Sequence, residues 1–183
     1  MVQLHNGSDI MVYVKKRWPI PLFFLVILSS CGYTFSGSGS LPENIQSVYV
    51  EVLKNNSSET RLESIFSNDL IDEFAKRDKR LLKRKDVADA VLTGTIKSVL
   101  FSTVLHSDQN VTFQERVEII VDLQLNSGDG ATVLWKRENI RESEIYDVDQ
   151  ENRLDTEQRK REALEKISER FAETVFRLLT EDF

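Results

Sequence analysis

The chain has little of what metal proteins and disulfide-linked proteins need. Among its 183 residues there is one cysteine, Cys31, and there are two histidines, His5 and His106. A single thiol cannot form a disulfide within the chain, and structural zinc sites take most of their ligands from cysteine and histidine. We therefore expect neither a disulfide nor a metal site.

Catalytic motifs are missing as well. The sequence contains no Gly-x-Ser-x-Gly nucleophile elbow and no glycine-rich phosphate loop. The acidic residues between Glu142 and Glu151 follow the pattern of a solvated face and loop, whereas carboxylates that act as general acids or bases need burial to shift their pKa values. We expect that the protein is not an enzyme, and a periplasmic hydrolase is the weakest hypothesis that stays open.

The chain also lacks a hydrophobic run that could cross a bilayer. Its apolar stretch Ile20–Leu28 has nine residues, whereas a membrane-spanning helix needs about 20. Lys15–Arg17 precede this stretch and Ser29-Ser30-Cys31 follow it, which is the order of a lipoprotein signal peptide. We expect residues 1–30 to be that signal peptide, with a more ordinary start at Met11.

In this interpretation Cys31 is the lipid attachment site. The Cys31 thiol takes a diacylglycerol, and the amino group that cleavage before Cys31 frees takes an acyl chain such as palmitate. Two or three acyl chains hold a protein firmly on a membrane, and Gly32 at the next position fits sorting to the outer membrane. The alternative is that Cys31 is an ordinary small apolar residue after a buried strand. We expect no cofactor besides the covalent lipid.

The predicted mature chain is acidic. Residues 1–30 hold three of the 24 basic residues and one of the 30 acids, so the remainder carries 21 basic and 29 acidic residues and a net charge of about −8. This balance argues against a nucleic-acid partner, because nucleic-acid binding depends on cations that neutralise phosphates.

One basic segment contrasts with this background, since seven of the ten residues from Lys76 to Lys85 are basic. The plainer interpretation is a solvated helix end, where cations complement the helix dipole. The alternative is a patch that binds phosphates of anionic head groups. The candidate phosphate contacts are Lys79, Arg80, Lys83, Arg84 and Lys85.

The periodicity of the mature chain predicts one α+β domain over residues 47–183, after a lipidated flexible tether at 31–46 that contains Ser-Gly repeats. The simplest architecture is a two-layer sandwich in the order β-α-β-β-β-α, with two helices on one face of a four-stranded, mostly antiparallel sheet. The expected strands are 47–53, 90–105, 111–125 and 131–146, and the expected helices run from a Thr60–Glu63 capping box to about Arg77 and from about Asp155 to the C-terminus.

Three smaller features complete this prediction. Gly94 indicates a bulge or a close backbone approach within its strand. Gly128 and Gly130 favour a hairpin turn with positive φ angles. The aromatic residues Trp135, Phe101 and Phe113 fit packing within the sheet better than a ligand platform.

Several phrases of the sequence, taken together, suggest a known family. They are Cys31–Phe35, Leu41-Pro42, Val48–Leu53, Ala88–Ile96 and Val133–Lys136. The Ala-Asp-x-Val-Leu-x-Gly phrase within Ala88–Ile96 also occurs in curli-secretion and TolB-like periplasmic domains. In combination with the signal-peptide pattern that ends at Cys31 (the lipobox) and with the order of the elements, the chain resembles the LptE family of lipopolysaccharide-assembly lipoproteins.

The resemblance implies a protein on the periplasmic face of the outer membrane, anchored in its inner leaflet. It implies that the domain binds and plugs an LptD-type β-barrel and takes part in the assembly and surface delivery of lipopolysaccharide. It also implies that basic residues at one end contact lipopolysaccharide, for which the cluster of Lys79, Arg80, Lys83, Arg84 and Lys85 is the candidate. The alternative is another outer-membrane lipoprotein adaptor, such as a secretion-system pilot or a curli-type assembly factor.

Overall fold

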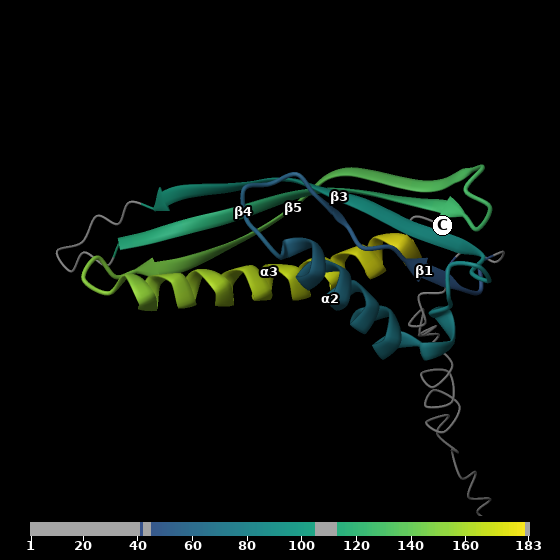
Figure 1. Ribbon diagram of the computed structural model, residues 1–183, viewed down its shortest axis with the longest axis horizontal. Helices are drawn as coiled ribbons and strands as arrows, with labels where there is room; N and C mark the ends of the chain where they lie inside the picture. Colours follow the sequence, from purple (N-terminus) through teal and green to yellow (C-terminus); the bar gives the residue numbers. More distant parts are fainter. Residues whose placement is uncertain (1–40, 42–44, 105–112, 182–183) are drawn as a thin grey trace, which may run out of the picture. The chain divides into compact units, whose positions relative to one another are not determined.

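The computed structural model describes Leu41 and residues 45–104 and 113–181, all of which belong to one compact unit. Cys31, most of the predicted tether, and His106 with its loop lie outside the described residues. The predicted α+β order β-α-β-β-β-α is confirmed (Figure 1). The elements are β1 (Val48–Val50), β2 (Lys54–Asn55), α2 (Leu62–Arg77), η1 (Lys79–Leu81), β3 (Ala90–Val104), β4 (Phe113–Ser127), β5 (Val133–Val148) and α3 (Arg153–Glu181).

Three long antiparallel strands form most of the sheet. β4 lies in the centre and pairs with β3 on one side and with β5 on the other. β1 and β2 follow one another along the outer edge of β3, and both run parallel to it. The sheet is therefore mixed and has five strands, although β1 and β2 share one position across it.

The predicted single strand over 47–53 is wrong, because β1 ends at Val50 and β2 begins at Lys54. The Glu51 N–H still donates to the Leu92 carbonyl at 2.9 Å. The Leu53 N–H, however, donates to the hydroxyl oxygen of Ser67 on α2 at 2.9 Å. A side chain of the helix thus accepts a hydrogen bond from a backbone N–H group that would otherwise belong to the edge strand. No local pattern in the strand sequence reveals this.

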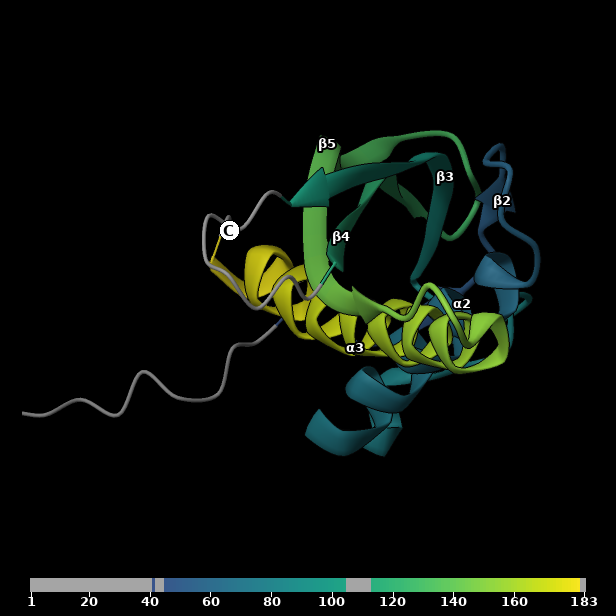
Figure 2. The same cartoon turned by 90° about the vertical axis from the view of Figure 1, so that its left-hand side faces the viewer.

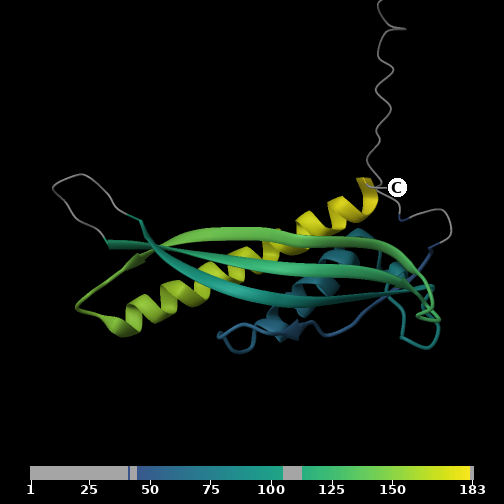
Figure 3. The same cartoon turned by 90° about the horizontal axis from the view of Figure 1, so that it is seen from above.

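Both helices cover one face of the sheet, as predicted (Figure 2). The alternate residues of β4 from Val117 to Leu125 point into this core and are almost fully buried. α3 crosses beneath the strands obliquely (Figure 3). It packs on α2 through two ring pairs, Phe66 with Phe171 at 5.2 Å and Phe74 with Phe176 at 5.3 Å between centroids.

The beginnings of both helices differ from the prediction. α2 starts after Arg61, which has a φ of 70° and makes no side-chain cap. The Thr60–Glu63 capping box does not form, since Glu63 Oε2 instead accepts a hydrogen bond from Asn55 Nδ2 at 2.9 Å. A residue on β2 outcompetes the local cap.

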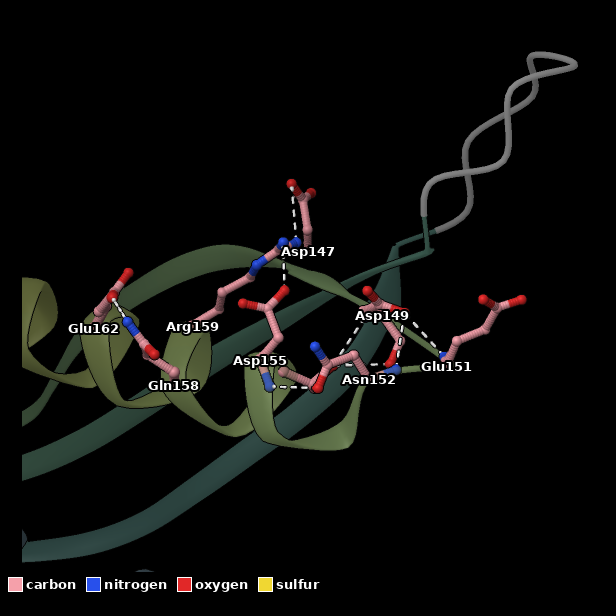
Figure 4. Close-up of polar contacts among 9 residues, drawn as sticks. Asp147, Asp149, Glu151, Asn152, Asp155, Gln158, Arg159 and Glu162 are labelled. Carbon is pink, nitrogen blue, oxygen red and sulfur yellow. Dashed lines mark hydrogen bonds and ion pairs between the residues drawn. The ribbon is translucent and has the colours of Figure 1, made fainter.

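α3 begins at Arg153, two residues before the predicted start near Asp155. The oxygen of the Asn152 side chain accepts a hydrogen bond from the Asp155 N–H at 3.2 Å, which makes Asn152 the N-cap (Figure 4). Asp149 orders the preceding turn, because its Oδ1 accepts from the N–H groups of Glu151 and Asn152. Gln158, three positions after Asp155, donates to Glu162 one turn further on.

The glycines have partly different roles from those expected. Gly130 has a φ of 73°, as predicted for the hairpin turn, but Gly128 has no positive φ. Gly128 is needed for space, because a Cβ there would lie 2.2 Å from the Ala88 carbonyl oxygen. Gly94 marks a close approach, with its Cβ position 2.4 Å from Leu123 Cδ2, while the bulge of β3 lies between Ile96 and Ser98.

Candidate functional site

The folded domain begins near the predicted lipid attachment site. Leu41 and Ile45 are buried in the core, so the chain is fixed to the domain from these residues on. Leu41 lies ten positions after Cys31, and ten residue steps span at most about 35 Å when the chain is fully extended. Any lipid on Cys31 would therefore hold this end of the domain close to the membrane surface.

The basic segment Lys76–Lys85 lies at this same end. It contains the last turn of α2 and η1, and then runs along the start of β1, where the Lys83 N–H donates to the Val48 carbonyl at 3.2 Å. Leu82 forms an isolated parallel bridge with Val48. The backbone of the segment is thus attached to the sheet, while its basic side chains are exposed.

The first two cations of the segment stabilise the end of α2. The carboxylate of Glu73 is buried, and Arg77 pairs with it at 2.8 Å and Lys76 at 3.8 Å. The Arg77 guanidinium also lies 5.4 Å from the ring centroid of Phe176 on α3. These two residues compensate a buried charge, so they follow the plainer interpretation of the segment.

Three of the five candidate phosphate contacts are also held by acidic neighbours. Arg80 forms a bidentate pair with Asp78, Arg84 forms one with Asp86, and Lys85 contacts Glu51 at 2.7 Å. The hydrogen bonds from the two arginines lower the pKa values of the Asp78 and Asp86 carboxyl groups.

The other two candidates, Lys79 and Lys83, are free to bind a ligand. In the described part of the chain, neither ammonium group has a hydrogen-bond or ion-pair partner, and both side chains are exposed. Lys83 and Arg80 line a groove of about 510 Å³ together with Ser47 and Asp89. The structure therefore reduces the readily available part of the cluster from five cations to two.

Asp89 is a structural residue of this end that the sequence analysis did not single out. Its Oδ2 accepts hydrogen bonds from Ser47 Oγ at 2.7 Å and from the Gln46 N–H at 3.1 Å. Its carbonyl accepts from the Gly128 N–H at 2.7 Å. Asp89 thus joins the start of β1, the start of β3 and the β4–β5 hairpin. This role of Asp89 and the tight contact at Gly94 explain two positions of the Ala-Asp-x-Val-Leu-x-Gly phrase. The phrase itself was the available signal.

A second groove, of about 410 Å³, lies at the other end of β3. Tyr146 donates to Glu115 Oε2 at 2.6 Å, and burial together with this hydrogen bond raises the pKa of the Tyr146 hydroxyl. Lys160 Nζ pairs with Glu59 at 2.7 Å and lies 4.7 Å from the ring centroid of Phe101. Thr156, which also lines this groove, is held by hydrogen bonds to the backbone of Asp149, so these four polar side chains have partners within the domain.

The aromatic residues divide into two groups. Trp135 is buried in the core, which confirms the packing interpretation. Phe101 and Phe113 are 39% and 43% exposed, so their predicted packing within the sheet is incomplete.

The acidic residues expected on a solvated face are partly engaged. Glu142 and Glu144 are half-buried, and Arg170 on α3 contacts Glu144 at 2.7 Å and Glu142 at 3.8 Å. Arg170 also donates to the Ser143 carbonyl at 2.7 Å, which covers part of the outer edge of β5.

Nothing in the described ranges gathers three or more metal-ligating side chains. Within the same residues, no helix has both the length and the apolar character required to cross a membrane.

Comparison with known proteins gives a family and a fold. The profile of the LptE family, described as lipopolysaccharide-assembly, matches residues 45–179. The solution structure of lipoprotein B from Nitrosomonas europaea is similar at 15% identity, with a TM-score of 0.51 and coverage of 81% of this chain and 90% of that one. The rare lipoprotein B of Shewanella oneidensis is 17% identical, with a TM-score of 0.48 and coverage of 71% and 94%. No curated protein sequence matches the chain.

Proposed function

We propose a function from the premise that this chain belongs to the LptE family of lipopolysaccharide-assembly proteins. The matched residues, 45–179, extend from just before β1 almost to the end of α3, so the match covers the whole described sandwich. This is the observation that carries the proposal. The family consists of outer-membrane lipoproteins that act without catalysis, and we infer that this chain is likewise an assembly protein and not an enzyme.

The proposed anchor is a lipid on Cys31. Residues 1–30 act as the signal peptide, starting at Met11 in the shorter form, and residues 31–46 tether the lipid to a single domain at 47–183. Leu41 and Ile45, near the end of this proposed tether, are buried in the core. Replacement of Cys31 by serine should leave an unprocessed precursor that takes up no labelled palmitate, and continued labelling would contradict the proposal.

The proposed partner is an LptD-type β-barrel in the outer membrane. A wide barrel has a lumen that must be filled by protein or water, and a compact two-layer domain can fill it. The open face of the sheet carries polar residues of β4 such as Glu118, Asp122 and Gln124, which suits contact with the polar interior of a barrel. The anchor raises the effective concentration of the domain near the barrel.

Purification of the C-terminally tagged, full-length chain from detergent-solubilised outer membranes tests this partner. We expect an LptD-type barrel of much greater mass to be retained with the tagged protein, and the barrel to be lost with a matched unanchored secreted form at the same concentration. Retention of secretion-system or curli components instead of the barrel would favour the alternative adaptor function.

The proposed ligand contact is between phosphate groups of lipopolysaccharide and the exposed cations Lys79 and Lys83, with Arg80, Arg84 and Lys85 beside them. The substitutions Lys79→Gln and Lys83→Gln should weaken binding of purified lipopolysaccharide at low salt, and the difference should shrink at high salt. Lys54→Gln is the matched control, because Lys54 is also exposed and has no partner among the residues described. If all three variants bind lipopolysaccharide equally, the segment is an ordinary solvated surface and does not contact the ligand.

A further inference from the structure

The basic segment contains two arginine–aspartate pairs that are arranged in opposite order along the chain. Asp78 precedes Arg80 by two residues, and Asp86 follows Arg84 by two residues. In the first pair, Arg80 Nη2 and Nε lie 2.7 and 3.0 Å from Asp78 Oδ2. In the second, Arg84 Nε lies 3.0 Å from Asp86 Oδ1, and Nη2 contacts Oδ2.

Both pairs are open to solvent and both are therefore weak. The Arg80 and Arg84 side chains are 88% and 82% exposed. Ion pairs at exposed positions contribute about 0.2–1 kcal/mol, because water and salt screen them. A phosphate, which offers more charge and three acceptor oxygens, can take the guanidinium from a single carboxylate in such a pair.

Each of the two free lysines is adjacent in sequence to one of the two arginines. Lys79 directly precedes Arg80 and Lys83 directly precedes Arg84, so each free cation has a held cation as its neighbour in sequence. A ligand that reaches Lys79 or Lys83 is thus next to an arginine whose partner is an intramolecular aspartate. Asp78 and Asp86 flank the residues from Lys79 to Lys85 and place two negative charges beside these cations, where an anionic ligand would arrive.

We propose that Asp78 and Asp86 are specificity-determining residues that compete with lipid phosphates for Arg80 and Arg84. With both pairs closed, the segment offers Lys79 and Lys83 alone. A ligand with two phosphates displaces the aspartates and engages all four cations, whereas a ligand with one phosphate engages fewer. The segment therefore discriminates by phosphate number. This inference rests on the proposed function, because it assumes that the segment contacts lipopolysaccharide.

The substitutions Asp78→Asn and Asp86→Asn test this competition. Asparagine keeps the oxygen that accepts the Arg80 N–H at 2.8 Å, so the turn at η1 should be preserved. It removes the charge that holds the guanidinium. From the strength of exposed ion pairs, each substitution should tighten binding by about 1.4- to 5-fold at low salt.

The probes are lipid A with two phosphates and lipid A with one phosphate, each in vesicles of otherwise neutral phosphatidylcholine, and the readout is the dissociation constant of the full chain. The preference of the natural chain for the two-phosphate form should fall in the double variant, because its arginines are free for either ligand. Asp72→Asn is the charge-matched control, as Asp72 is exposed on α2 and has no partner among the described residues.

A double-mutant cycle separates competition from a general loss of negative charge. In an Arg80→Gln background, Asp78→Asn should improve binding no more than Asp72→Asn does. If Asp78→Asn and Asp72→Asn act equally in the natural background, the competition does not exist, while lipopolysaccharide binding through Lys79 and Lys83 still stands. If the natural chain binds neither probe, the proposed ligand contact itself fails, and the inference fails with it.

Discussion

Ser47 and Asp89 bind each other through two hydrogen bonds that join elements 42 residues apart. Ser47 Oγ donates to Asp89 Oδ2 at 2.7 Å, and the Asp89 N–H donates to Ser47 Oγ at 3.1 Å. The same Asp89 carboxylate accepts the Gln46 N–H, and the Ser47 carbonyl accepts the Ala90 N–H at 3.1 Å. The edge strand β1 is therefore fastened to β3 where the chain enters the domain.

The substitution Asp89→Ala should destabilise the domain by about 1–3 kcal/mol, because it leaves the partly buried Ser47 hydroxyl and the Gln46 N–H without their acceptor. Chemical denaturation followed by circular dichroism measures this loss. Asp86→Ala is the control, since Asp86 makes only a solvent-exposed pair with Arg84, and it should change stability little. Equal effects of the two substitutions would show that the junction at Asp89 contributes nothing special.

Gly94→Ala should also be destabilising. The added Cβ would lie 2.4 Å from Leu123 Cδ2, 2.8 Å from Leu53 Cδ2 and 2.9 Å from the Asp122 carbonyl oxygen. The leucine side chains can move, but the backbone oxygen belongs to the paired strand, so we expect a loss of about 1–3 kcal/mol. Gly130→Ala is the comparison: its Cβ would meet nothing, and only its φ of 73° opposes alanine, at a cost of about 1 kcal/mol. A stability order opposite to this one would contradict the close contact at Gly94.

Two buried serines should respond oppositely to the same substitution. Ser67 Oγ accepts the Leu53 N–H at 2.9 Å and donates to the Glu63 carbonyl at 2.5 Å. Ser168 Oγ, on α3, is buried and has no hydrogen-bond partner among the described residues. Ser67→Ala should therefore lower the free energy of unfolding by about 1–3 kcal/mol, and Ser168→Ala should leave it unchanged or raise it. Thermal or urea unfolding of both variants gives the comparison, and a marked destabilisation by Ser168→Ala would show that its hydroxyl is in fact satisfied.

Tyr146 should make the domain sensitive to alkaline pH. Burial and the hydrogen bond to Glu115 raise the pKa of its hydroxyl above the ordinary value of 10.0. The unfolded chain then loses this proton near pH 10 while the folded chain keeps it, so the unfolded state binds fewer protons and stability falls as the pH rises above 10. In Tyr146→Phe this part of the pH dependence should disappear. An identical decline of stability in both proteins between pH 9 and 11 would contradict the assignment.

The architecture was predictable because the long elements have clear periodicities. Apolar and polar residues alternate from Val117 to Leu125, which is typical of a strand with one buried face, and an apolar stripe from Leu164 to Leu178 is typical of a helix that packs on one side. The predicted ends were less accurate. At Leu53 and at Glu63, hydrogen bonds from other elements replaced the local pattern that the prediction had used.

The sequence predicted which cations make up the candidate site, but it did not predict which of them lack a partner within the domain. Seven cations between Lys76 and Lys85 were evident from the sequence. Which of them are free depends on partners that fold next to them, such as Glu51 beside Lys85 and the buried Glu73 beside Arg77. Sequence spacing alone does not determine whether a nearby carboxylate points at a given cation.

The sequence alone determined the acidic balance of the chain, the lipobox pattern around Cys31 and the order of its strands and helices, since these depend on residue identity and on short-range periodicity. Only the tertiary structure decided that β1 and β2 are separate, that Asp89 joins three elements and that, within the basic segment, Lys79 and Lys83 have no partner among the described residues. These properties depend on contacts between residues far apart in sequence, whose partners are set only when the helices pack on the sheet.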